Sequence, residues 1–186
     1  MVRITGGSFK GRRLKGPRGR SLRPTSDMVR KAIFDVLGPE GAKGRRVLDL
    51  FAGSGALGFE ALSRGAQEVV FVEKDKGAVD LIKQNIQALD VQERTRVFNL
   101  EAKKAIRVLA EKGLSFDLIL VDPPYREERS SGTILREIMD KGLLPPGGIV
   151  VFEHPAPRAP SPPEGLSPIG VKRYGDTAVS FFIREA

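Results

Sequence analysis

The tetrapeptide Asp122-Pro123-Pro124-Tyr125 places a carboxylate, a rigid backbone and an aromatic ring in consecutive positions, directly after the apolar run 117–121. A proline fixes φ at about −65° and lacks a backbone N–H, so this turn is stiff and rich in carbonyl acceptors. We expect Asp122 and the Pro123 carbonyl to accept hydrogen bonds from the exocyclic amine of a base. This frees the nitrogen lone pair for methyl transfer, while Tyr125 stacks on the base. The alternative is a Pro-Pro turn with a surface tyrosine.

A glycine-rich loop follows an earlier apolar run, and its Gly53, Gly55 and Gly58 satisfy the pattern G-x-G-x-x-G. Such glycines let a ligand approach the backbone closely. Glu73, at the end of the next apolar run, has the spacing of an acid that binds a ribose hydroxyl pair. The pattern alone is equally typical of a nicotinamide-dependent dehydrogenase.

Asp49 favours one cofactor over the other. In a dinucleotide site the first glycine directly follows the strand, and the pyrophosphate lies at the helix N-terminus. Here Asp49 and the pair Phe51-Ala52 intervene. A carboxylate at this point suits a cofactor with a cationic amino group and no phosphate, which is the character of S-adenosylmethionine. The alternative is that Asp49 binds the amides of its own loop, and one carboxylate can do both.

The composition excludes several other chemistries. The 186 residues contain no cysteine and one histidine, so a cysteine nucleophile, covalent methylation at pyrimidine carbon 5 and a thiolate zinc site are all excluded, and we expect no metal. The chain has no apolar stretch of about 18 residues, and its start lacks the apolar core of a signal peptide. We therefore expect a cytoplasmic protein that does not bind membranes.

Positive charge is concentrated at the N-terminus. Residues 1–31 contain ten Lys and Arg and a single acid, whereas the net charge of the whole chain is only +8. This distribution predicts a basic arm, residues 1–25, that follows a phosphate backbone, joined to a near-neutral domain, residues 26–186. The alternative is a solvated tail. Ile4, Phe9 and Leu14 favour a small hairpin, because they give the arm apolar anchors.

Strands and helices alternate through the rest of the chain. After a helix that Ser26 or Asp27 caps and that ends at Leu37, continuous apolar strands indicate an α/β fold with a parallel sheet covered on both faces. The expected strands are 46–51, 69–73, 95–98, 117–121 and 148–152, and the expected helices are 56–64, 75–89, 102–112 and 130–141. Pro155 to Pro168 should form an extended connection, and 168–174 with 177–183 a closing hairpin.

Acidic residues follow several of these strands. Asp49, Glu73, Glu101 and Asp122 each come at the carboxyl end of a predicted strand, and in an open parallel sheet the ligand crevice lies at these ends. We expect the four side chains to share one rim, with Glu101 and Ala102 near an adenine amine. The alternative for Glu101 is a helix cap.

The chain resembles the RsmD family of bacterial 16S ribosomal RNA guanine-N2 methyltransferases, which are class I S-adenosylmethionine-dependent enzymes. The resemblance implies a Rossmann-like, seven-stranded sheet of order 3-2-1-4-5-7-6 whose last strand is antiparallel. It covers nearly the whole length, and the motifs that carry it are Arg3-Ile-Thr-Gly-Gly-Ser-Phe-Lys-Gly-Arg-Arg-Leu14, Leu22-Arg-Pro-Thr-Ser-Asp27, Val29-Arg-Lys-Ala-Ile-Phe34, Leu48-Asp-Leu-Phe-Ala-Gly-Ser-Gly-Ala-Leu-Gly58, Phe71-Val-Glu-Lys-Asp75 and Asp122-Pro-Pro-Tyr125.

The resemblance also implies roles for individual residues and a partner. The partner is ribosomal RNA. Because a small chain must choose one amine among many, we expect it to recognise the folded shape of an assembled or assembling small subunit, and we expect it to be a monomer. Catalysis falls to Asp122, Pro123 and Tyr125. The residues expected to bind the cofactor are Asp49, Phe51, Ala52, Gly53, Ser54, Gly55, Glu73, Lys74, Glu101, Ala102 and Asp122. The residues expected to bind RNA are Arg3, Lys10, Arg12, Arg13, Arg23, Thr25 and Arg30. Glu101 departs from the family, which more often has Asp or Asn before the alanine.

Two alternatives to this function remain. The same chemistry could act on adenine-N6 or cytosine-N4 of DNA or on a protein glutamine, although glutamine enzymes typically have Asn at the position of Asp122. The chain could also be a non-enzymatic RNA-binding protein with a vestigial cofactor pocket. His154, after Glu153, is more typical of a structural histidine than of a general base.

Overall fold

The structure is a computed structural model that describes residues 2–17, 24–124 and 131–186, without the side chains of 24–26 and 131. Two residues predicted to act at the site, Arg23 and Tyr125, lie outside this description, and of Thr25 only the backbone is included. No helix in the described ranges has both the length and the apolar character that a membrane crossing requires.

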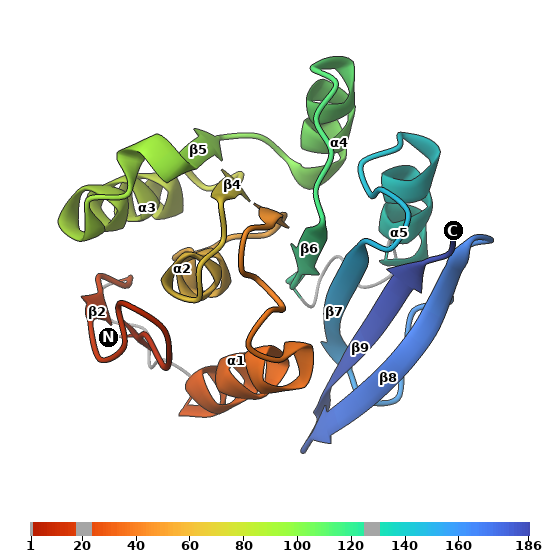
Figure 1. The fold of residues 1–186 in the computed structure, drawn as a ribbon, viewed down its shortest axis with the longest axis horizontal. Coiled ribbons are helices and arrows are strands. Elements are labelled where there is room, and N and C mark those ends of the chain that lie inside the picture. Colours follow the sequence, from red (N-terminus) through yellow and green to blue (C-terminus); the bar gives the residue numbers. More distant parts are fainter. Residues whose placement is uncertain (1, 18–23, 125–130) are drawn as a thin grey trace.

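A seven-stranded sheet of order β5-β4-β3-β6-β7-β9-β8 forms the centre of the molecule (Figure 1). Neighbouring strands are parallel except that β9 runs antiparallel to both β7 and β8. In chain order this is 3-2-1-4-5-7-6, and the predicted fold class is confirmed. The strands are β3 (Arg46–Asp49), β4 (Glu68–Val72), β5 (Thr95–Phe98), β6 (Leu118–Val121), β7 (Ile149–Pro155), β8 (Leu166–Tyr174) and β9 (Thr177–Arg184).

Helices cover both faces of the sheet, because successive strand residues point to opposite sides. Val47 of β3 packs into a core with α1, α2 and α3, whereas its neighbour Leu48 packs into a second core with α4 and α5. Figure 1 shows these two helical layers on either side of the strands. The helices are α1 (Pro24–Leu37), α2 (Ala56–Ser63), α3 (Lys76–Leu89), α4 (Ala102–Glu111), α5 (Ser131–Asp140) and the short 3-10 helix η1 (Gln92–Arg94).

The start of α1 corrects one prediction. The helix begins at Pro24, not after a cap at Ser26 or Asp27. Proline suits a first helical turn because its fixed φ is already helical and the missing N–H would have no partner there. Asp27 therefore lies within the first turn, where its carboxylate pairs with Arg30 at 2.9 Å.

The proline-rich connection is also shorter than predicted, because β7 continues through Pro155 and β8 already contains Pro168. β8 is an edge strand, and its register shifts between Pro168 and Gly170. Proline fits an edge strand at such an irregularity, since its position there requires no ladder N–H.

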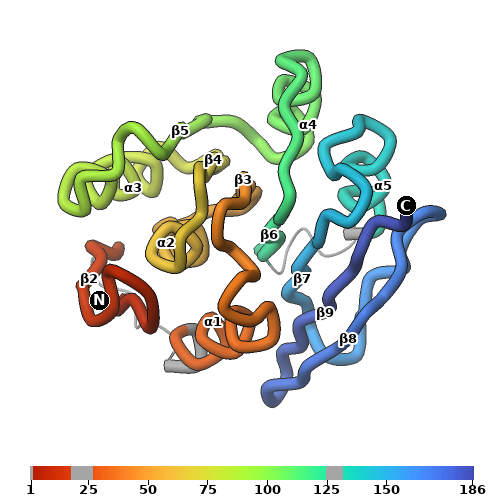
Figure 2. The backbone as a smooth tube through the Cα atoms, viewed as in Figure 1, coloured from red at the N-terminus to blue at the C-terminus, as the bar shows by residue number. Residues whose placement is uncertain are grey.

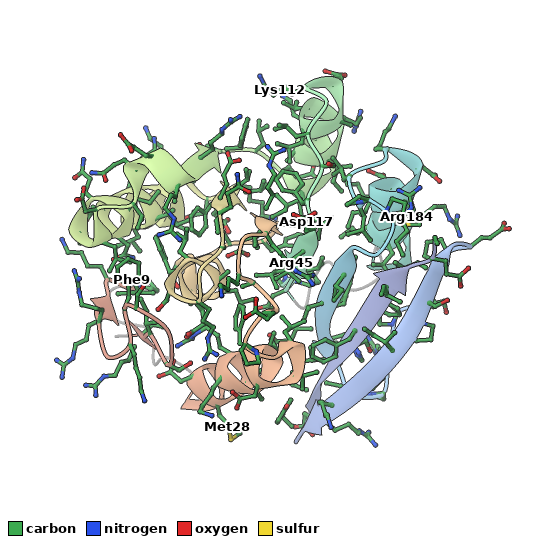
Figure 3. All side chains as sticks on the ribbon, in the orientation of Figure 1. Phe9, Met28, Arg45, Lys112, Asp117 and Arg184 are labelled. Atoms are coloured by element: carbon green, nitrogen blue, oxygen red, sulfur yellow. The ribbon has the colours of Figure 1, made fainter. Side chains whose placement is uncertain are left out.

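The N-terminal arm forms a hairpin in which β1 (Val2–Arg3) pairs antiparallel with β2 (Arg13–Leu14). Val2, Ile4 and Leu14 are buried in the same core as α1 and α2. The hairpin lies beside α2 in Figure 2, and Figure 3 shows Phe9 on its α2 side, whereas Met28 of α1 points outward. The arm is therefore packed against the helical layer.

Candidate active site

A cavity of about 620 Å³ lies at the carboxyl ends of the parallel strands. Its walls come from the segments that follow β3, β4, β5 and β6, from the ends of β7 and β9, and from Val2, Pro17 and Arg30 at the N-terminal side. The predicted site residues that line it are Phe51, Ala52, Gly53, Ser54, Glu73, Lys74, Glu101, Ala102, Asp122 and Pro123. The glycine loop and the Asp-Pro-Pro turn thus share one cavity.

The loop after β3 turns sharply at two glycines. Gly53 has a φ of 56° and Gly55 a φ of 84°, both in the left-handed region that glycine enters without steric cost. A Cβ on Gly55 would lie 2.7 Å from a ring carbon of Phe59. Gly55 therefore allows the turn to pack closely against Phe59, but it is not among the described residues that line the cavity.

Glu73 joins the first two loops of the site. One carboxylate oxygen accepts a hydrogen bond from the N–H of Gly53 at 2.7 Å, and the other accepts from the N–H of Asp75 at 2.9 Å. Each oxygen of a carboxylate can accept more than one hydrogen bond. Glu73 is therefore fixed in the cavity wall and retains the capacity to bind a pair of hydroxyl groups.

Asp49 does not occupy the predicted position. Its side chain is 1% exposed, is not among the described cavity residues, and accepts a hydrogen bond from the N–H of Gly58 at 3.0 Å. Burial raises the pKa of Asp49 to about 7; the hydrogen bond from Gly58 acts against this shift, and the charge of Glu73 adds to it. The geometry corresponds to the alternative in which Asp49 binds an amide of its own loop and helix, and not to direct contact with a cofactor.

Glu101 and Ala102 close the far end of the cavity. Glu101 occupies the N-cap position of α4, but within the described chain its side chain makes no capping hydrogen bond. It is exposed toward solvent and lines the cavity. The first N–H groups of a helix have no partner within the helix, so Ala102 offers a main-chain donor beside the Glu101 carboxylate. Asn99 steadies this end, because its amide donates to the carbonyls of Glu73 and Lys74, each at 2.9 Å.

Asp122 and Pro123 follow the fully buried strand β6 directly. Asp122 is exposed and Pro123 is half-buried, and both line the cavity at its rim. The rigid strand and the two prolines hold this carboxylate where a base that enters from solvent can reach it.

The cavity wall also contains residues that were not among the predicted site residues. β7 extends beyond its predicted end and brings Glu153 and His154 into the wall, which Thr177 of β9 also lines. The position of a strand next to β6 in a doubly wound sheet could have indicated them. Apolar residues complete the lining: Leu50, Ala56, Leu57, Val72 and Leu100.

His154 is held by both ring nitrogens. Nδ1 lies 2.7 Å from the carbonyl oxygen of Pro155 and Nε2 lies 2.7 Å from Oγ of Ser180. A carbonyl only accepts, so Nδ1 carries a proton, and in the neutral ring Nε2 accepts from the Ser180 hydroxyl. These contacts give His154 a structural role and leave its lone pair engaged.

The predicted RNA contacts separate into two groups. Arg3, Lys10, Arg12 and Arg13 are exposed on the arm. Arg30, in contrast, is 3% exposed and bound to protein groups, which corrects the prediction that it grips RNA directly. A guanidinium at this depth can be buried only because carboxylates and a carbonyl compensate its charge.

The chain is similar to known proteins in both sequence and fold. The family model described as "Conserved hypothetical protein 95" matches residues 2–183. Ribosomal RNA small subunit methyltransferase D of Escherichia coli K12 is 36% identical over 187 residues, which covers 100% of this chain and 91% of that protein. The structure of hypothetical protein TTHA0928 of Thermus thermophilus matches with a TM-score of 0.80 and 33% identity over 100% of both chains.

A more distant structure shares the fold alone. It is the Thermus thermophilus 16S rRNA N2 G1207 methyltransferase RsmC in complex with AdoMet and guanosine, with a TM-score of 0.72 at 23% identity. The match covers 100% of this chain and 49% of that one.

Proposed function

The chain belongs to the family of ribosomal RNA small subunit methyltransferase D, and from this premise we propose that it transfers a methyl group from S-adenosylmethionine to the exocyclic N2 amine of a guanine in small-subunit ribosomal RNA. One observation carries the proposal: the glycine loop that follows β3 and the Asp122-Pro123 turn that follows β6 line the same cavity. A methyl donor and a target amine can meet only if their sites share such a space.

The residues in the wall fit S-adenosylmethionine. Glu73 would accept from its ribose hydroxyl pair, Gly53 lets it approach the backbone closely, and Glu101 with the Ala102 N–H would bind the adenine edge. The apolar lining residues, which include Leu50 and Leu100, suit a purine ring. When bound, this cofactor supplies a methyl group on a sulfonium, which is electrophilic.

The chain's own contribution lies in the presentation of the amine. Asp122 and the Pro123 carbonyl would each accept one N–H of the target nitrogen, so its lone pair is directed away from the ring and toward the methyl carbon. A bond from nitrogen to carbon forms while the bond from carbon to sulfur breaks. The nitrogen then carries a positive charge and loses a proton to Asp122 or to water, since the exposed Asp122 contacts solvent.

No strong general base is required for this step, which agrees with the engagement of both His154 nitrogens. Orientation and electrostatic stabilisation account for the rate instead. The base itself must leave its stack or loop to reach the rim.

The RNA would approach along the exposed cations of the arm, Arg3, Lys10, Arg12 and Arg13. We propose that the substrate is an assembled or assembling subunit, because a chain of this size must select one amine by the folded shape of its substrate. We also propose that the protein acts as a monomer.

The deciding experiment is nucleoside mass spectrometry of ribosomal RNA after incubation with the protein and isotopically labelled S-adenosylmethionine. We expect labelled N2-methylguanosine, with more product from assembled subunits than from naked RNA. In a parallel incubation with DNA, labelled N6-methyladenine or N4-methylcytosine would instead support the alternative substrates. No transfer to either nucleic acid despite cofactor binding would refute the enzymatic function.

Two variants at residues that flank β6 provide a matched pair. Asp122→Asn should reduce kcat about 10³-fold, a loss typical of a group that stabilises the transition state directly, while calorimetry shows the same cofactor affinity within about threefold. Asp117→Asn alters a carboxylate that precedes the same strand and accepts from the N–H of Arg46 at 2.9 Å. It should keep full activity, because it lies at the opposite end of β6 from the cavity.

A further inference from the structure

A single buried carboxylate anchors the arm. Glu60 of α2 is fully buried, and one of its oxygens accepts from the N–H and hydroxyl of Thr5, each at 2.9 Å, and from Nε of Arg30 at 3.1 Å. The other oxygen accepts from the N–H of Gly6 at 3.1 Å and from Nε of Arg64 at 3.0 Å. Glu60 thus binds the arm, α1 and its own helix together.

The hydrogen bonds of this cluster favour the ionised form of Glu60. Burial alone would raise the pKa of Glu60, but the hydrogen bonds from Thr5, Arg64 and Arg30 outweigh burial and lower it overall. Arg30 is 3% exposed, pairs with Asp27 at 2.9 Å and donates to the carbonyl of Arg3 at 2.6 Å. Buried ion pairs contribute little net stability compared with apolar residues, so the effect of this network is to fix one geometry.

The helix that carries Glu60 also carries the cofactor loop. Gly55, the last residue of the glycine loop that would bind the cofactor, is the N-cap of α2. The last turn of the same helix contacts the arm. Ser63 there accepts from the N–H groups of Phe9 and Ser8 at 2.9 and 2.8 Å. A Cβ on Gly7 would lie 2.0 Å from the Ser63 carbonyl oxygen, so the two backbones are in direct contact. An eight-residue helix, about 12 Å long, separates the two sites.

We propose that Glu60 is a positioning residue for RNA recognition, which fixes the exposed cations of the arm at a set distance from the cofactor loop. Lys10, Arg12 and Arg13 would bind the phosphate backbone of the RNA. The fixed distance from these cations to the cavity would then determine which base places its amine at Asp122. Arg30, which these contacts hold, and Val2 of the arm both line the cavity. This inference rests on the proposed function, since it assumes an RNA ligand.

Glu60→Gln is the direct test, because glutamine keeps the length of the side chain but has one oxygen fewer and no charge. Glu68→Gln is the matched control: Glu68 also bridges two arginines, Arg46 at 3.3 Å and Arg96 at 2.9 Å, but it begins β4 and lies outside the arm. Cofactor affinity by calorimetry, RNA affinity by filter binding, and kcat and KM with the unmethylated subunit are measured for each.

For Glu60→Gln we expect an unchanged cofactor Kd, and an RNA Kd and a KM for RNA that both rise about tenfold, the equivalent of one lost charge-assisted hydrogen bond. Trypsin should cleave the folded variant faster at Lys10 to Arg13. Glu68→Gln should match the wild type in every measurement. Unchanged RNA binding by folded Glu60→Gln overturns the inference, and so does an equal loss of cofactor and RNA affinity, because that result indicates a general structural role.

A milder variant covers the case in which Glu60→Gln does not fold. Thr5→Val removes only the hydroxyl that bonds Glu60 and Arg64, and it should weaken RNA binding in the same selective manner. An unchanged RNA affinity in Thr5→Val would count against the inference. Filter binding needs no turnover, so if the wild type binds RNA but transfers no methyl group, the proposed function fails while the role of Glu60 is still tested.

Discussion

Replacement of Asp49 by asparagine should stabilise the protein, and more so at high pH. In the folded protein burial raises the pKa of Asp49 from 3.8 to about 7. The folded state therefore binds a proton that the unfolded state releases between these values. This contribution to stability is complete below pH 3.8 and is lost as the pH rises to about 7.

The magnitude follows from the size of this shift. One pKa unit is worth about 1.4 kcal/mol, so the rise from 3.8 to about 7 corresponds to a total of about 4 kcal/mol. The part that falls between pH 5 and pH 8 is about 3 kcal/mol. The asparagine of the variant is neutral throughout, and its amide oxygen can still accept from the Gly58 N–H. The difference in unfolding free energy between Asp49→Asn and the wild type should therefore increase by about 3 kcal/mol from pH 5 to pH 8.

Urea unfolding of both proteins at the two pH values measures this difference directly. Asp117→Asn is the control, because its half-buried carboxylate also accepts a main-chain N–H and its loss reports the general effect of a removed charge. A difference between Asp49→Asn and the wild type that stays constant with pH would show that Asp49 is ionised in the fold, and would refute the reasoning from burial.

Three further predictions concern helix α2, the cofactor site and the arm. Gly58→Ala should destabilise the fold by about 1–3 kcal/mol, because its Cβ would lie 2.3 Å from a ring carbon of Phe71. Gly132→Ala in α5, where a Cβ meets no described atom within 4 Å, is the control in urea unfolding and should not destabilise the fold, since alanine favours a helix over glycine. Glu73→Gln should raise the cofactor Kd about tenfold or more in calorimetry, and an unchanged Kd would remove Glu73 from the cofactor site. Lys10→Ala and Arg13→Ala should each lower the slope of log K for RNA against log salt by about 1; an unchanged slope in both would place the RNA elsewhere.

The fold was predictable because its signals are local and repeated. Runs such as Val69 to Val72 are buried on both faces, and only a sheet with two helical layers accommodates such strands. The rim of the site followed from the same rule, since carboxyl ends of parallel strands meet at one edge. The sequence did not predict that β7 extends to Pro155, because a proline normally ends a strand. Here Pro155 forms the last pair of the ladder with β9.

The errors at the site have a different origin, because they concern which charged residues are buried. Residue type alone places Arg30 on the surface. Its burial is possible because the carboxylates of Glu60 in α2 and Asp27 in α1, together with the Arg3 carbonyl, accept its hydrogen bonds. Asp49 presents the same difficulty in reverse. Its position in the motif suits contact with a cofactor. In the structure, however, the Asp49 carboxylate is buried and accepts a hydrogen bond from the N–H of Gly58, nine residues later in the chain.

The arm and the catalytic core are mechanically linked, and this restricts how RNA binding can be studied. An isolated two-stranded hairpin is at best marginally stable in water, and Val2, Ile4 and Leu14 complete a core that also contains α1 and α2. Removal of the arm would uncover that core. It would also leave the buried carboxylate of Glu60 without Thr5 and Gly6, which costs more than the loss of an exposed ion pair. Loss of activity on truncation would therefore report damage to the cofactor side as well as the loss of the proposed RNA contacts, whereas single substitutions such as Lys10→Ala or Thr5→Val separate the two.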